Sequence, residues 1–378
     1  MDETAPRPAG AAEITHSPQG GLRGEHPGRS RNPVIKVADL AWLEFEKPDL
    51  HRAEMFARDF GFAVATRTPD ALYLRGTLPG TYCLVVRRGP VSRFVGPVFA
   101  AADGSDLSRL ARAAGTDVRE LDGPGGGRVV ALRDPSGVPV RVVHGTEQLR
   151  ALPEQAPLPL NSGTTLRRTN APQRPPREPA RIQRLGHVVL ETPVFGRALD
   201  WYLDTLGMIV SDFLFLDGQR ERGPTMAFIR CDRGADPADH HTLAMHLGPG
   251  TGYVHSAYQV ADLDALAAGG EYLAERGYRR AWGIGRHIQG SQIFDYWRDP
   301  DRLMLEHFTD GDRFDASIAP GWAPMTATGL AQWGPPVTRD FLGVQPSPTL
   351  VRTVLRALRD DNEIDTARLT GLMKAMNS

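Results

Sequence analysis

The chain has 378 residues, enough for about two to three domains, and 44 Lys and Arg balance 45 Asp and Glu to a net charge of −1. This balance excludes the basic surface that nucleic acids and anionic membranes attract, and no apolar run reaches the roughly 18 residues of a transmembrane helix. The N-terminus lacks an apolar signal segment, and two cysteines, Cys83 and Cys231, cannot form a disulfide framework or a cysteine-based zinc site. We therefore expect a cytoplasmic protein.

Composition divides the chain into five segments. Residues 1–33 are rich in Gly, Pro, Arg, Ser and His and predict a disordered tail. Short apolar runs with turn signals predict one domain over 34–147 and a second over 181–310, joined by a Pro-rich polar linker at 148–180. Residues 311–378 predict an extension that begins irregularly and ends in helices near 348–359 and 364–376, the second capped by Asp365.

An internal repeat relates the two predicted domains. Each carries a strand, a turn with Pro and a helix ending at Gly; then a strand leading into a helix; and finally an Asp-Pro turn followed by an alternating strand. The matching segments are 40–62 and 185–208, 94–103 and 253–262, and 133–143 and 298–308. The repeat predicts an α+β fold with curved mixed sheets, in which each domain contains two βαβββ modules.

Three residues of the second domain have no counterpart in the first. His187 lies on the first strand of one module, His255 on the first strand of the next, and Glu306 on the last strand of that module. The equivalent places in the first domain hold other residue types, namely Trp42, Gly96 and Arg141. A residue that maintains the fold tends to recur in both copies, whereas a site residue need not, so the difference points to a site.

Two imidazoles and one carboxylate form the ligand set that binds Fe(II) on one face and leaves other positions open. Side chains alternate along a strand, so Val254 and Ser256 are expected on the face opposite His255. A single strand histidine is more often structural than functional. Three such residues on equivalent central strands favour a metal site.

Further polar residues surround this set in the sequence. His240 and His241 directly precede a strand, while His287 and Tyr296 lie 19 and 10 residues before Glu306. A hairpin between the strands of Tyr296 and Glu306 would return the tyrosine hydroxyl to the metal face. Tyr296 as a cross-strand packing residue and His287 as a loop histidine remain open alternatives.

Over about 34–310 the sequence resembles the type I extradiol ring-cleavage dioxygenases of the vicinal oxygen chelate superfamily. The segment GRHIQGSQIFDYWRDPDRLMLEHF carries His, Tyr and Glu at the family's spacing, and RLGHVVLET, DHHTLAM and YVHSAYQVAD add to the match. There are two departures. The family often has His-His where this chain has Val254-His255, and usually Asp-Pro-x-Gly where Asp301-Arg302 occur.

The resemblance implies a two-domain vicinal oxygen chelate fold whose N-terminal domain is metal-free. It implies Fe(II), with Mn(II) as a possible substitute, on His187, His255 and Glu306. One of His240 and His241 would be the acid–base residue, and the pair His287 and Tyr296 would bind substrate.

The expected activity is Fe(II)-dependent extradiol cleavage of a substituted or bicyclic catechol with O₂, giving a hydroxymuconate-semialdehyde-type product, in a homo-oligomer. Aromatic residues of the second domain fit an apolar substrate or simply core packing; they are Phe213, Phe215, Phe228 and Trp282. Trp322 and Trp333 are expected either to cover the pocket mouth or to join subunits.

Two alternatives stay open. The same fold hosts metal-dependent isomerases and lyases that do not use O₂, whose ligands commonly come from both modules and include a second Glu. A non-catalytic protein that binds a small molecule is the other. Oxygen uptake on adding a catechol separates both from a dioxygenase.

Overall fold

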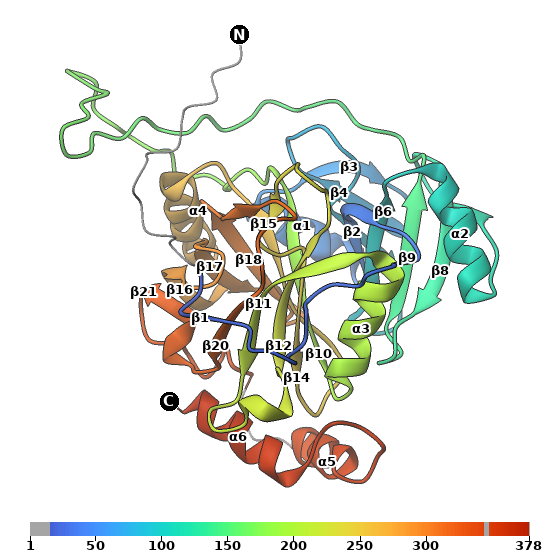
Figure 1. Cartoon of the computed structure of the whole chain (residues 1–378). Helices are drawn as coiled ribbons and strands as arrows, with labels where there is room; N and C mark the ends of the chain where they lie inside the picture. Colours follow the sequence, from blue (N-terminus) through green and yellow to red (C-terminus); the bar gives the residue numbers. More distant parts are fainter. Residues whose placement is uncertain (1–15, 344–347, 378) are drawn as a thin grey trace.

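A computed structural model describes residues 16–343 and 348–377. Two large mixed sheets with few helices make up the fold, one of eight strands and one of eleven (Figure 1). Within the described ranges, no helix has both the length and the apolar character needed to cross a bilayer.

The eight-stranded sheet is built from two βαβββ modules. The first module comprises β2 (Val37–Lys47), α1 (Leu50–Phe60), β3 (Ala63–Arg67), β4 (Ala71–Arg75) and β5 (Leu84–Arg88). The second comprises β6 (Arg93–Ala101), α2 (Gly104–Ala114), β7 (Arg119–Glu120), β8 (Arg128–Arg133) and β9 (Pro139–His144). The strand order is β3-β4-β5-β2-β6-β9-β8-β7, so the first strands of the two modules, β2 and β6, pair at the centre.

The eleven-stranded sheet repeats this plan. Its first module comprises β10 (Arg184–Thr192), α3 (Phe195–Leu206), β11 (Met208–Phe215), β12 (Met226–Cys231) and β14 (Leu243–Leu247). Its second comprises β15 (Gly252–Gln259), α4 (Leu263–Glu275), β16 (Arg279–His287), β17 (Ile293–Arg298) and β18 (Met304–Thr309). The order β11-β12-β14-β10-β15-β18-β17-β16 again places the two first strands, β10 and β15, side by side. The predicted α+β fold of paired βαβββ modules is confirmed.

Local sequence signals explain where the helices begin and end. Asp49 caps α1 by accepting a hydrogen bond from the backbone N–H of Arg52. The helix ends at Gly61, whose φ of 105° lies in the left-handed region. A Cβ at Gly61 would lie 1.7 Å from the carbonyl oxygen of Ala180, so only glycine allows the start of the second half to pack there.

The N-terminal segment departs from its prediction. Residues 1–15 lie outside the described residues, but residues 16–33 are ordered rather than disordered. The strand β1 (Gln19–Gly20) pairs with β20 (Gly321–Pro324), which in turn pairs with β11. Arg220 also pairs with Glu25, at 2.7 Å between Nε and Oε1. This Gly- and Pro-rich segment has no hydrophobic periodicity of its own. It is ordered because backbone groups of β1 pair with the edge strand β20 of the second sheet.

The extension after residue 310 is also more regular than predicted. Its strands lengthen the second sheet at both edges, β20 beside β11 and β21 (Ala331–Trp333) beside β16, while β19 (Arg313–Phe314) pairs with β13 (Ala238–Asp239). Two helices follow, α5 (Pro348–Ala357) and α6 (Thr366–Met376). Both helices and the Asp365 cap are confirmed, since Asp365 accepts from the N–H of Arg368. Residues 148–180 contain no named helix or strand and follow an extended path between the halves (Figure 1).

Candidate metal centre

Three neighbouring central strands carry the predicted ligands. Ala257 on β15 lies opposite His187 of antiparallel β10 and also opposite Glu306 of parallel β18. His255 precedes Ala257 by two residues. Because side chains alternate along a strand, His187, His255 and Glu306 all point to the same face of the sheet.

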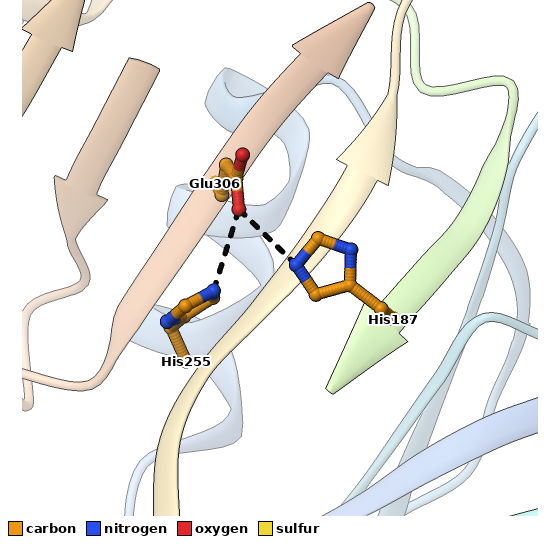
Figure 2. A group of neighbouring side chains, drawn as sticks. All are labelled: His187, His255 and Glu306. Atoms are coloured by element: carbon orange, nitrogen blue, oxygen red, sulfur yellow. Dashed lines mark ion pairs between the residues drawn. The ribbon is translucent and has the colours of Figure 1, made fainter. Parts of the chain in front are cut away.

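The three side chains converge on one point (Figure 2). The Oε2 atom of Glu306 lies 3.4 Å from Nε2 of His187 and 3.4 Å from Nε2 of His255. One ligand atom from each residue lies within 4.8 Å of the others. Ligands on one face of an octahedron, at roughly 2.1 Å from a metal, are about 3 Å apart. The spacing therefore suits a single divalent ion.

Hydrogen bonding gives an independent test of whether a metal fits. Neither carboxylate oxygen of Glu306 has a hydrogen-bond partner among the described residues, nor does Nδ1 of His187 or of His255. Glu306 is fully buried. A buried carboxylate without donors is costly unless a cation compensates it. The residues present fit a divalent metal.

Burial and proximity set the protonation states that a metal requires. Burial alone would raise the pKa of Glu306, but its interactions with His187 and His255 outweigh that cost and lower the pKa below its usual value. Burial lowers the pKa of His255 to about 4, so this imidazole is neutral at neutral pH. A neutral imidazole and an ionised carboxylate are the forms that bind metal.

The first half has an ion pair where the second has this cluster. Trp42 and Arg141 both lie opposite Val98, as His187 and Glu306 lie opposite Ala257, which confirms the equivalence predicted from the repeat. The Nη1 atom of Arg141 lies 2.6 Å from Oε1 of Glu44, which also accepts from the indole N–H of Trp42. Across the ranges that the structure describes, His187, His255 and Glu306 are the one cluster spaced to hold a metal.

The predicted hairpin brings Tyr296 and His287 beside the cluster. Tyr296 on β17 pairs with Glu306 on antiparallel β18. Nε2 of His287 lies 2.8 Å from the Tyr296 hydroxyl and 3.9 Å from Oε1 of Glu306. Nδ1 of His287 lies 2.7 Å from the carbonyl oxygen of Leu330, to which it donates. Burial, reinforced by Glu306, raises the pKa of Tyr296 well above its usual value, so the hydroxyl keeps its proton.

Of the two adjacent histidines, His241 contacts the cluster and His240 contacts His241. The His241 ring packs against His187, with 4.0 Å between ring centroids. His240 lies behind it: the two Nδ1 atoms are 3.0 Å apart, and Nε2 of His240 is 2.7 Å from Oδ2 of Asp212. Burial and the neighbouring imidazoles lower the pKa of His241 well below its usual value. The sequence reasoning missed Asp212, because it lies on β11, which carries none of the motifs.

Aromatic residues separate into two groups. Phe228 contacts His241 and Trp282 contacts Tyr296, with centroids 5.1 and 5.8 Å apart, so both flank the site. Phe341 lies 4.8 Å from Tyr296 and was not predicted, since it belongs to the extension outside the repeat. The other group consists of core residues and one surface residue. Phe213 and Phe215 pack against buried Trp322, and Trp333 is half-exposed on β21.

Comparisons with known proteins show which family the chain resembles. The Glyoxalase/Bleomycin resistance protein/Dioxygenase superfamily profile matches residues 184–307. Metapyrocatechase 2 of Cupriavidus necator is 31% identical over 339 residues, covering 87% of this chain and 98% of that protein. An iron-dependent extradiol dioxygenase of Rhodococcus jostii (strain RHA1) is 24% identical, covering 82% and 100%.

Among solved structures, an extradiol ring-cleaving dioxygenase from B. fuscum has the same fold. It superposes with a TM-score of 0.68 at 19% identity, over 84% of each chain. The fold, the paired modules and the metapyrocatechase relationship lead to one conclusion: the chain belongs to the type I extradiol ring-cleavage dioxygenases of the vicinal oxygen chelate superfamily.

Proposed function

We propose that this protein binds Fe(II) through His187, His255 and Glu306 and cleaves a substituted or bicyclic catechol with O₂ beside the diol. The product would be of the hydroxymuconate-semialdehyde type. The observation that carries the proposal is the buried Glu306 carboxylate, which two imidazoles face at 3.4 Å and to which none of the described residues donates a hydrogen bond.

Bound at this site, Fe(II) would act as a Lewis acid and as a template for a diol and O₂, since three protein ligands leave coordination positions open. Two neutral imidazoles and one carboxylate would hold the ion and leave it a net positive charge, which would favour binding of a catecholate. Mn(II) would suit the same donors.

Three other residues would handle protons and orientation. His241, packed on His187, is the base that takes a proton from the diol and later returns one to the product. The Tyr296 hydroxyl and His287, 2.8 Å apart, would hydrogen-bond a substrate oxygen and hold the ring in one orientation.

The flanking aromatics favour a substrate with an apolar substituent. Phe228 lies on one side of the cluster, while Trp282 and Phe341 lie beside Tyr296 on another. Aromatic side chains gain from stacking on an aromatic substituent, by about 1 kcal/mol beyond area burial. Unsubstituted catechol would forgo this contact.

The test is O₂ uptake by the Fe(II)-loaded protein with catechol, 3-methylcatechol and 2,3-dihydroxybiphenyl, followed together with the yellow ring-cleavage product. We expect one O₂ per diol and a kcat/KM at least about tenfold higher for a substituted diol than for catechol. His187→Ala should abolish turnover, whereas Glu191→Gln, on the same strand, should retain it. Native-rate cleavage by His187→Ala, or diol consumption without O₂ uptake, would contradict the proposal.

A further inference from the structure

We propose that Asp212 and His240 act as positioning residues that hold His241 in the tautomer with its proton on Nδ1, so that Nε2 is unprotonated. The inference deepens the proposed function, in which His241 is the base. It rests on a hydrogen-bonded series of three buried side chains rather than on any titration.

The direction of each hydrogen bond follows from the first. An ionised carboxylate can only accept, so Oδ2 of Asp212, 2.7 Å from Nε2 of His240, requires a proton on that nitrogen. A neutral His240 then has a lone pair on Nδ1. That atom lies 3.0 Å from Nδ1 of His241, which must therefore donate. The proton of a neutral His241 is thereby placed on Nδ1, and Nε2 keeps its lone pair.

The packing holds this series in place. Asp212 and His240 are each 1% exposed, and His241 is 4% exposed. The backbone of His240 is fixed on both sides, because its N–H donates to the carbonyl of Asp312 and its carbonyl accepts from Ser211 Oγ. Its ring is flanked by Phe228 and Phe314, with centroids 5.5 and 5.4 Å away. The ring has little room to turn and exchange its two nitrogens.

Residues of the N-terminal segment lie beside Asp212, next to the carboxylate oxygen that does not contact His240. Nε2 of His16 lies 3.0 Å from the carbonyl oxygen of Ser211 and 3.6 Å from Oδ1 of Asp212. Ser17 is buried and donates to the carbonyl of Trp322. Among the described residues Oδ1 has no hydrogen-bond partner, so the bond from His240 to Oδ2 is the one side-chain hydrogen bond that holds this buried carboxylate.

This arrangement gives Asp212 a role that its charge alone does not explain. A base must present a lone pair to the substrate proton, and in a buried histidine the partner of the other nitrogen decides which one is free. In a serine-protease triad, replacing Asp by Asn imposes the wrong tautomer and lowers turnover by orders of magnitude. In Asp212→Asn, the amide would donate to Nε2 of His240, and the hydrogen bond between His240 and His241 would reverse with it. His241 would then carry its proton on Nε2.

The direct test is long-range ¹H–¹⁵N NMR on the full chain with ¹⁵N-labelled histidine, loaded with diamagnetic Zn(II). The His241 signals are those that His241→Asn removes. We expect Nδ1 protonated and Nε2 unprotonated in the natural protein, and the reverse in Asp212→Asn. In the Fe(II)-loaded enzyme, Asp212→Asn should lower kcat at least about tenfold with unchanged iron content and little change in KM.

The matched control is Asp200→Asn, which removes a second Asp–His pair, with His26, on the surface at 2.9 Å. It should alter neither the His241 tautomer nor kcat. A natural protein with Nε2 of His241 protonated, or an Asp212→Asn variant with unchanged tautomer and kcat, would overturn the inference. Should Asp212→Asn not fold, the natural spectrum and His240→Phe, which removes the acceptor and should release the tautomer, still decide it. If no diol is cleaved, the proposed function fails, while the spectra still test the tautomer.

Discussion

Glu306 supplies the one negative charge of the proposed ligand set. Replacing it by Gln keeps the shape but removes the negative charge that would compensate a divalent ion beside His187 and His255. We expect Glu306→Gln to weaken metal binding more than about 100-fold, the loss that even outer-shell partners can cause. Metal content after dialysis against a graded chelator measures this. The control is Glu191→Gln, because the Glu191 carboxylate of the natural protein accepts a hydrogen bond from the N–H of Gly250. This variant should bind metal normally. Equal metal retention in the Glu306→Gln and Glu191→Gln variants would contradict the assignment.

Tyr296 offers a separate test of the substrate side. Its hydroxyl lies 2.8 Å from His287 and carries no metal bond in the proposed set. Tyr296→Phe should therefore keep its iron but lose one hydrogen bond to the substrate, worth about 1.5 kcal/mol or roughly tenfold in kcat/KM. Steady-state kinetics with measured iron content check this. A loss of iron would mean that Tyr296 supports the metal rather than the substrate.

At the scale of elements, the strand repeat predicted more of the site than any single motif. Register along β10, β15 and β18 follows from alternation and repeat, so the shared face of His187, His255 and Glu306 could be expected. The order of His240 and His241 could not, because both follow a two-residue strand whose direction depends on a distant partner, β19. Asp212 and Phe341 were equally hidden, since tertiary packing alone brings β11 and the extension to the cluster.

The N-cap of α6 allows a prediction about the stability of a single helix. Asp365 accepts from the N–H of Arg368 and pairs with Arg222 at 2.5 Å, half-exposed. Asp365→Ala should lower the free energy of unfolding by about 1 kcal/mol, the usual value of an N-cap. Asp365→Asn retains a capping oxygen and loses only an exposed ion pair, so its cost should be a few tenths of a kcal/mol. Urea unfolding of both variants measures the difference; equal losses would show that the ion pair, rather than the cap, stabilises the helix.

At the scale of the whole molecule, the two halves are joined by buried and half-buried polar contacts that no local pattern indicates. Nζ of Lys47 lies 2.5 Å from Oδ2 of Asp299 and 2.7 Å from Oδ2 of Asp301, in the turn that leads to the Glu306 strand. The hydroxyls of Tyr272 and Tyr278 both donate to Asp59. The first half thus supports the strands that carry the proposed ligands, although its described residues contain no comparable cluster.

His307 also lies at the contact between the two halves, and its burial predicts that the stability of the fold depends on pH. It points away from Glu306, stacks on Phe60 and lies 2.8 Å from the carbonyl oxygen of that residue. Burial lowers its pKa from 6.5 to about 4. Because the folded pKa lies below the unfolded one, the unfolded chain binds more protons between these values. The stability of the fold therefore falls as pH drops from 6.5 towards 4, by up to about 3 kcal/mol for this group, and is unaffected by it above 6.5.

His307→Gln can still donate to the carbonyl but cannot titrate. The free energy of unfolding of His307→Gln, measured in urea from pH 7 to 4 on metal-free protein, should decline less steeply than that of the natural chain. Parallel curves for the two proteins would show that His307 does not carry this part of the acid sensitivity.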